Sequence, residues 1–335
     1  MVFPITTPGR ASRSCKPNRP DETPERPLPT FVVATTKGRH EGSARGEDEV
    51  RQRRLRRSQR KRSLRAVPDD FRVQLTRVEM VRRTVAGRTR ETDQLAREEP
   101  LEIRLGGQSI AVTMRTPGHD EELAAGFLLT EGIVQRASEI TGILRPDENA
   151  LNVLLAPGVK VDLERLTRHV FASSSCGVCG KATIESVQQR FPPIESPFVV
   201  ATETLLLLPE RLRTAQKVFD QTGGLHAAAI FDPSGKLIVS REDVGRHNAV
   251  DKTIGYGLLN HQLPFDQHIL LVSGRASFEI VQKALAARIP VVAAVSAPSS
   301  LAVEFAEENG QALIGFLRPP SLNVYCHPER VRGVD

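Results

Sequence analysis

The clearest alternation of apolar and polar residues in the chain lies between residues 101 and 114. Residues 101–105 and 109–114 each alternate in hydrophobic character, and Gly106 and Gly107 separate the two runs. Successive side chains of a strand point to opposite faces, so each run indicates a strand with one buried face. Because two glycines suit a tight turn, the segment predicts a β-hairpin.

A helix is predicted directly after this hairpin. Leu123 and Phe127 are spaced as one face of a helix, and three acidic residues precede them in what would be its first turn. Thr116 is expected to cap the helix, with Pro117 at its first position. Gly132 is expected to mark its end.

After residue 193, short apolar runs alternate with helical patterns. Residues 232–235 (DPSG) separate two apolar runs and predict a second hairpin. Strands interleaved with helices predict an α/β (α+β) fold whose mixed, partly parallel sheet has helices on both faces. The expected strands are residues 227–231, 236–240, 269–272, 291–295 and 312–316, and the expected helices are residues 277–287 and 300–309.

Three polar loops follow the predicted strands of this sheet. They are residues 241–248 (REDVGRHN), 273–277 (SGRAS) and 296–300 (SAPSS). Ligands of such sheets gather at the carboxyl ends of the strands. The second and third loops also lead into helix N-termini, where backbone N–H groups suit a phosphate. The three loops together predict an anion-binding face.

These patterns divide the chain into four parts. Residues 1–70 hold 17 Lys/Arg against 9 Asp/Glu and have little periodicity, so we expect a disordered basic extension. Residues 71–172 are expected to form a small α+β N-terminal domain, residues 173–192 a cysteine-bearing loop and helix, and residues 193–330 a larger α/β domain. The body is close to neutral, so nucleic acid is not an expected partner.

The composition places the chain among soluble globular proteins. No apolar run approaches the roughly 18 residues that span a bilayer, and the N-terminus lacks an apolar signal core, so a cytoplasmic location is expected. Four cysteines in 335 residues do not make a disulfide framework. In a reducing compartment, a close pair indicates metal binding or catalysis.

Cys176 and Cys179 form such a pair, with the Cys-x-x-Cys spacing. Ile184, Val187 and Phe191 follow at helical spacing, so the pair is predicted to lie just before a helix N-terminus. Unpaired backbone N–H groups favour the thiolate there. One interpretation is thiol chemistry, in which one cysteine attacks sulfur and holds it while its neighbour resolves.

Two metal interpretations compete with thiol chemistry. A structural zinc site would need two more ligands, and the available donors, Cys326 and His327, are adjacent rather than spaced. A zinc deaminase would need His-x-Glu followed by Pro-Cys-x-x-Cys. The chain has His119 and Glu121, but Ser175 stands in place of the proline.

The chain from about Val73 to His327 resembles the FdhD family of formate dehydrogenase accessory sulfurtransferases. The resemblance rests on five stretches in the same order: residues 116–128 (TPGHDEELAAGFL), 175–180 (SCGVCG), 222–226 (TGGLH), 243–252 (DVGRHNAVDK) and 273–283 (SGRASFEIVQK). Residues 1–70 lie outside it.

The resemblance implies a cytoplasmic homodimer that accepts persulfide sulfur from a cysteine desulfurase on Cys176 and Cys179. It implies that the sulfur passes to the molybdenum cofactor in its bis-guanylyl form (Mo-bis-molybdopterin guanine dinucleotide), a bound cargo, before that cofactor enters formate dehydrogenase. It also implies a cytidine-deaminase-like fold for residues 193–330. A non-enzymatic alternative is a cofactor-binding chaperone whose cysteine pair only steadies a loop.

The resemblance also implies a cofactor-binding segment at residues 278–283, beside the predicted anion-binding loop 273–277. We expect Arg275 or Lys283 to meet phosphate. A purely structural alternative pairs Arg275 with Glu279 and lets His247 and Asp243 cap a helix that begins near Asn248. The expected cofactor-binding residues are Ser273, Gly274, Arg275, Ser277, Phe278, Glu279, Ile280, Val281, Gln282, Lys283, Arg246, His247 and Ser299.

Overall fold

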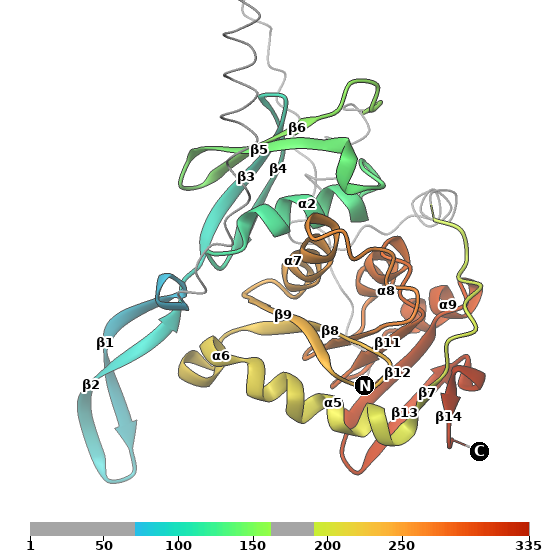
Figure 1. Cartoon of the computed structure of the whole chain (residues 1–335). Helices are drawn as coiled ribbons and strands as arrows, with labels where there is room; N and C mark the ends of the chain where they lie inside the picture. The colour runs from blue at the N-terminus through green and yellow to red at the C-terminus, as the bar shows by residue number, and fades with distance from the viewer. Residues whose placement is uncertain (1–70, 162–190, 335) are drawn as a thin grey trace, which may run out of the picture. The chain divides into compact units, whose positions relative to one another are not determined.

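The structure is a computed structural model that describes residues 71–161 and 191–334. Cys176, Cys179 and nearly all of the helix predicted after them lie outside the described residues. The described part contains a six-stranded sheet, a four-stranded sheet and two pairs of strands (Figure 1). Within it, no helix has the length and apolar character needed to cross a bilayer.

The six-stranded sheet has the order β13-β12-β11-β10-β8-β9. Its middle strands β10, β11 and β12 run parallel, and the other three join it antiparallel. All residues of β10 and β11 are buried, as short apolar runs covered on both faces should be. The predicted mixed sheet is confirmed, with strands β8 (His226–Phe231), β9 (Leu237–Asp243), β10 (Ile269–Val272), β11 (Val291–Ala294), β12 (Ala312–Arg318) and β13 (Ser321–Cys326).

Helices cover both faces of this sheet (Figure 1). Neighbouring residues of β10 point to different cores: Leu270 packs in the core that includes α7, α8 and α9, and Leu271 in the core that includes α5. This alternation follows from the two-residue period of a strand. The helices are α5 (Thr202–Ala215), α6 (Lys217–Thr222), α7 (Arg246–Leu259), α8 (Phe278–Ala286) and α9 (Ser300–Glu308).

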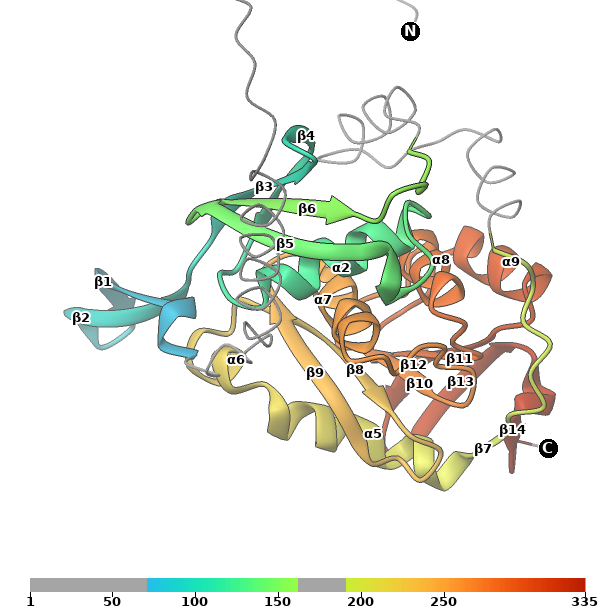
Figure 2. The ribbon, with the colours of Figure 1, turned by 45° about the horizontal axis from the view of Figure 1, so that its top comes forward.

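A four-stranded sheet of order β4-β3-β6-β5 is built from residues earlier in the chain. Its strands β3 and β4 are the predicted hairpin. Leu101 and Ile103 of β3 belong to the same core as helices α2 and α7, and Figure 2 shows these helices between the two sheets. The strands are β3 (Glu99–Leu105), β4 (Gln108–Arg115), β5 (Ile140–Asp147) and β6 (Ala150–Leu155).

The helix predicted after this hairpin is α2 (Asp120–Thr130), and it begins later than expected. The prediction that Thr116 caps it is wrong, because Gly118 and His119 have left-handed φ values of 100° and 55° and interrupt the helical path. Thr116 is instead fully buried. Gly132, with a φ of 68°, follows the helix end as predicted.

Helices α2 and α7 cross at two glycines. A Cβ atom on Gly126 would lie 1.9 Å from the carbonyl oxygen of Asp251, and one on Gly255 would lie 1.8 Å from that of Glu122. Real Cβ atoms do not approach backbone so closely, so the crossing requires glycine on both helices. It brings the backbones of the two halves of the described chain into direct contact.

Several elements were not predicted from the sequence. Strands β1 (Leu75–Thr84) and β2 (Gly87–Ala96) pair over their full length, but no residue of either is buried, so their sequences show no clear alternation. Helix α5 carries four consecutive leucines and an internal proline, which obscure its helical period. The remaining short elements are η1 (Phe71–Gln74), η2 (Ala137–Glu139), η3 (Pro328–Arg330), β7 (Val200–Ala201) and β14 (Val331–Arg332).

Candidate functional site

The three polar loops meet at one end of the six-stranded sheet, beyond the last residues of its strands. Strands β9, β10 and β11 all end there, because β8 runs antiparallel to both β9 and β10 and β11 runs parallel to β10. Backbone bonds join the second and third loops: Ser296 N–H donates to the Gly274 carbonyl (3.3 Å), and Ala276 N–H donates to the Ala297 carbonyl (3.2 Å). The predicted convergence of the three loops is therefore observed.

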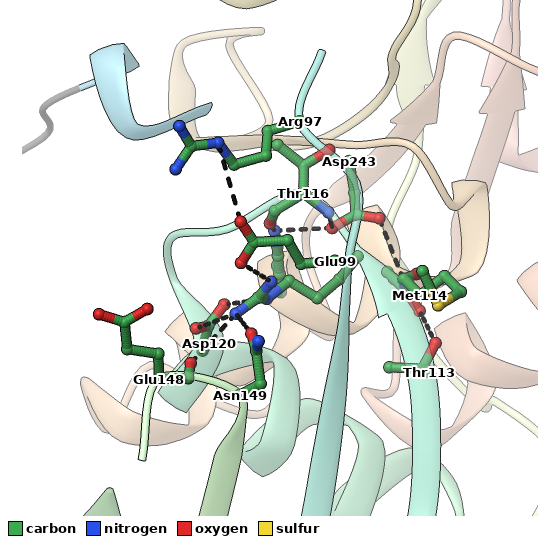
Figure 3. Close-up of polar contacts among 12 residues, drawn as sticks. Arg97, Glu99, Thr113, Met114, Thr116, Asp120, Glu148, Asn149 and Asp243 are labelled. Atoms are coloured by element: carbon green, nitrogen blue, oxygen red, sulfur yellow. Dashed lines mark hydrogen bonds and ion pairs between the residues drawn. The ribbon is translucent and has the colours of Figure 1, made fainter. Parts of the chain in front are cut away.

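The first loop is held from beneath by the fully buried carboxylate of Asp243. Its Oδ1 accepts bonds from Gly245 N–H (2.8 Å) and the Asn248 side-chain amide (3.0 Å). Its Oδ2 lies 2.7 Å from Lys252 Nζ and accepts the N–H of Thr116 at 3.1 Å (Figure 3). A buried ammonium and three further hydrogen-bond donors offset the cost of removing this carboxylate from water. It fixes the backbone from which Arg246 and His247 project.

The segment that carries Thr116 is itself anchored by buried Arg115. Its guanidinium bonds both carboxylate oxygens of Asp120 (3.0 and 3.2 Å) and one oxygen of Glu99 at 3.2 Å (Figure 3). Arg145 adds a second cation 3.1 Å from Asp120. A bidentate arginine is strongly directional. The four-stranded sheet thereby sets the position of the Thr116 backbone, which contacts Asp243.

Arg246 and His247 lie at the N-terminus of α7, as the first two residues of that helix. Nε of Arg246 is buried and has no hydrogen-bond partner among the described residues. Burial and the cations of Lys283 and Arg246 lower the pKa of His247 to about 4. Burial and Arg246 also lower the pKa of His226. Both imidazoles are therefore neutral at pH 7, and Arg246 carries the positive charge of this corner.

The second loop places small and polar groups beside these side chains. Ser277 Oγ lies 3.3 Å from His247 Nε2, and Glu279 Oε2 lies 3.7 Å from the same nitrogen. Because Gly274 has no side chain, His226 comes close: a Cβ at Gly274 would lie 3.3 Å from its Nδ1. Arg275 is exposed, and no ion pair joins it to Glu279 or to any other described residue. The structural alternative for Arg275 is not observed.

Helix N-termini on this face differ in how they are capped. Gly245 and Ser277, which precede α7 and α8, form no side-chain capping bond, whereas Ser299 accepts the N–H of Ala302 at the start of α9. The start of α7 consequently retains N–H groups for a ligand, whereas at α8 the N–H of Ile280 already bonds the Ser277 carbonyl at 3.1 Å. The side chain of Ser299 is used within its own helix.

Lys283 does not lie where a phosphate could reach it, and this corrects our expectation for that residue. It is buried, and its Nζ lies 2.9 and 2.8 Å from the two carboxylate oxygens of Asp251 and 2.9 Å from Thr130 Oγ1. Burial alone would lower its pKa, but Asp251 and Glu131 outweigh that effect, and the pKa of Lys283 is raised. Lys283 thus links α8 to α7 and α2 through buried polar contacts.

The rest of the expected segment is also largely internal. Ile280 and Val281 are fully buried in the core, and Phe278 packs edge-on against Phe305 with 4.9 Å between ring centroids. Gln282 donates to the Thr130 carbonyl at 3.3 Å. Direct contact with a ligand is thus open to Ser273, Gly274, Arg275, Ser277, Glu279, Arg246 and His247, at the loop face.

The donors of the two metal interpretations are separately engaged. Cys326 is buried and its thiol donates to the Gln311 carbonyl; burial raises its pKa to about 11, which disfavours the thiolate. His327 bonds Glu329 through Nδ1 at 2.7 Å. His119 lies 3.5 Å from Glu122. In residues 71–161 and 191–334, no three His, Cys, Asp or Glu side chains are grouped to hold a metal ion.

Sequence reasoning missed the charged interior beneath the site. Asp243, Lys252, Asp251 and Arg115 were not assigned to buried pairs, because a charged residue ordinarily lies on the surface. In the structure, residues 249–255 of α7 are all buried although the helix mixes polar and apolar types, and the sequence alone does not show this burial. An acid and a base at positions 251 and 252 of such a helix point to buried pairing.

Three comparisons relate the chain to known proteins. A model of the FdhD/NarQ family matches residues 96–332. A protein of Mycolicibacterium paratuberculosis named Sulfur carrier protein FdhD is 53% identical over 71% of this chain and 92% of its own length. One of the same name from Saccharolobus solfataricus is 42% identical over 77% and 99%. A crystal structure from Desulfotalea psychrophila, described as a formate dehydrogenase accessory protein, aligns with a TM-score of 0.64 at 26% identity, over 77% and 99% of the two chains.

Proposed function

Because the chain belongs to the FdhD/NarQ family, we propose that it is a sulfur carrier required for formate dehydrogenase activity. The observation that carries this proposal is the 53% identity to a named sulfur carrier over 92% of that protein's length. The Cys-x-x-Cys of Cys176 and Cys179 supplies the thiol chemistry that such a role needs.

In this proposal, the thiolate of Cys176 attacks the outer sulfur of a desulfurase cysteine persulfide. The sulfur–sulfur bond of the donor breaks, its thiolate leaves, and a persulfide forms on Cys176. Cys179 then attacks the inner sulfur, which yields a disulfide and releases hydrosulfide to the acceptor. A cellular dithiol reduces the pair for the next cycle.

The proposed acceptor is the bis-guanylyl molybdenum cofactor, carried as cargo before it enters formate dehydrogenase. Its pyrophosphates suit the loop face, where no side chain caps the start of α7 and Arg246 presents a buried Nε without a partner among the described residues. Arg275, exposed on the neighbouring loop 273–277, adds a second cation. We expect the carrier to act as a cytoplasmic homodimer.

Mass spectrometry of the intact protein tests the sulfur step. After incubation with a cysteine desulfurase and cysteine, the protein should gain the mass of one sulfur atom, and Cys176→Ala should abolish the gain. If the protein takes up no sulfur and both cysteine variants still support formate dehydrogenase, the protein is a cofactor chaperone. Zinc that is retained by the native chain and lost from both variants would favour a metal site.

Calorimetry with guanosine diphosphate tests the loop face separately. Arg275→Ala should weaken binding roughly tenfold, as expected for one charge-assisted contact. Arg83→Ala, an exposed arginine on β1, is the matched control and should leave binding unchanged. Equal affinities of both variants would place the nucleotide elsewhere.

A further inference from the structure

The outer edge of β9 has no role in the proposed sulfur transfer. β9 is the last strand of the six-stranded sheet, and no other described strand pairs with its outer side. In an antiparallel pair, every second residue directs its N–H and C=O groups away from the partner strand. β9 therefore presents backbone donors and acceptors on the side opposite β8, although the Ser240 carbonyl already accepts a bond from the Arg241 guanidinium at 2.8 Å.

The two edges of the same sheet are built differently. At the other edge, pairing of β13 with β12 contains two register shifts, and two prolines lie in the turn between the strands. Such irregularities block the addition of a further strand. β9 has no proline, and its pairing with β8 has a single register shift, between Leu237 and Val239, after which it is regular to Asp243. β9 thus keeps the geometry that accepts another strand.

A cavity of about 330 Å³ runs beside this edge, and the six consecutive residues 237–242 line it. At roughly 3.3 Å per residue, they can pair with an extended segment of about six residues. Gln74 and His119 line the cavity from the N-terminal part, and Ala215, Lys217 and Val218 from the link between α5 and α6. Residues from outside β9 thus line the cavity as well, and Tyr256 of α7 is one of them.

The charges of the cleft select the kind of segment. Arg241 is paired with Glu122 through two contacts of 2.5 and 2.8 Å. Glu242 is turned to the start of α6, where it accepts the N–H groups of Val218 and Phe219 at 3.0 and 2.8 Å. Lys217 is exposed and forms no ion pair within the described part of the chain. Its ammonium is therefore available to a carboxylate.

We propose that the edge of β9 binds an extended acidic segment of a partner protein, which adds a seventh strand to the sheet and places a carboxylate at Lys217. Main-chain bonds supply the affinity in this mode of recognition, and flanking side chains supply specificity. β9 continues directly into the loop that carries Arg246 and His247. A segment bound here holds its parent protein beside the loop face, and the proposal does not depend on sulfur transfer.

The probe is a fluorescent, capped six-residue peptide that alternates valine and glutamate, titrated against the full chain by anisotropy. Binding should saturate, weaken as salt rises, and protect the amides of residues 237–243 from hydrogen exchange. Lys217→Glu should weaken it about three- to tenfold. Lys160→Glu, the same change at an exposed lysine outside the cleft, should not.

A second peptide, N-methylated at two consecutive central residues, loses a donor on each of its edges. It should not bind, because neither edge can then complete the ladder with β9. Equal binding of the methylated peptide, or protection confined to other strands, would overturn the proposal. Protection of residues 237–243 that rises with protein concentration in the absence of peptide would assign the edge to a second copy of the chain instead.

Discussion

Replacement of Gly255 by alanine tests the helix crossing that joins the two halves of the described chain. The new Cβ would lie 1.8 Å from the Glu122 carbonyl oxygen and 2.8 Å from the Gly126 nitrogen. Both contacts are to backbone, so no side chain can rotate away. An ordinary contact between non-bonded heavy atoms is roughly 3.5 Å long. The clash is relieved only if α2 and α7 separate by roughly the difference, which is more than 1 Å.

The cost can be worked from these contacts. Overpacking a tight core costs about 1–3 kcal/mol, and a rigid backbone contact belongs at the upper end. Alanine in a helix interior returns about 1 kcal/mol relative to glycine. The net loss of about 2 kcal/mol should lower the melting temperature by about 4–8 °C for a body of this size.

Circular dichroism during heating measures this change. Gly224→Ala is the matched control, because its Cβ would meet nothing closer than 3.7 Å and its φ is not left-handed. It should shift melting by about 2 °C or less. If Gly255→Ala melts together with Gly224→Ala, the helices do not cross in backbone contact and the reasoning fails.

Three further predictions concern buried groups. Lys283→Met leaves the Asp251 carboxylate without its cation and should lower the free energy of unfolding in urea by about 3–5 kcal/mol. Adding Asp251→Leu to Lys283→Met should restore much of that stability. A double variant that is no more stable than Lys283→Met would contradict this account. The pKa of His247 is lowered to about 4 in the folded protein, so the His247 imidazole is protonated in the unfolded chain at a higher pH than in the folded one. The free energy of unfolding should therefore fall as pH drops from about 6.5 toward 4, and His247→Gln should reduce that fall. Cys326, its pKa raised to about 11, should resist iodoacetamide at pH 8 in the native protein and react once unfolded, as peptide mass spectrometry would show.

The local sequence patterns predicted most strands of the sheet but not the long-range contacts that position the elements around it. The hairpin around Gly106 was predictable because one buried face imposes an alternation on β3, and the strands at residues 269–272 and 291–294 were predictable because burial on both faces gives short, continuously apolar runs. The start of α2 was not, because Thr116 is recruited by Asp243, more than a hundred residues away. Local capping rules carry no information about such a partner.

The candidate site was predicted at the level of loops and less well at the level of side chains. Small and polar residues after strands correctly indicated the convergence of the loops at residues 241–248, 273–277 and 296–300, although residues 241–243 are the end of β9. Lys283 was misassigned because the resemblance implied that residues 278–283 bind the cofactor, whereas Lys283 lies in the last turn of α8 and points into the interior. Its partners Asp251 and Thr130 come from α7 and α2, which only the tertiary structure brings together.

The packing of α2 on α7 also has a consequence for synthesis on the ribosome. The side chains of α2 that it buries, among them Leu123 and Leu128, enter a core shared with α7. Thr130 and its partner Asp251 are separated by 121 residues. At about 5–20 residues per second, roughly 6 to 24 s pass between their appearance. During that interval the apolar face of α2 is not covered by α7. Nascent chains halted before α7 should therefore bind ribosome-associated chaperones, and chains extended past α7 should release them.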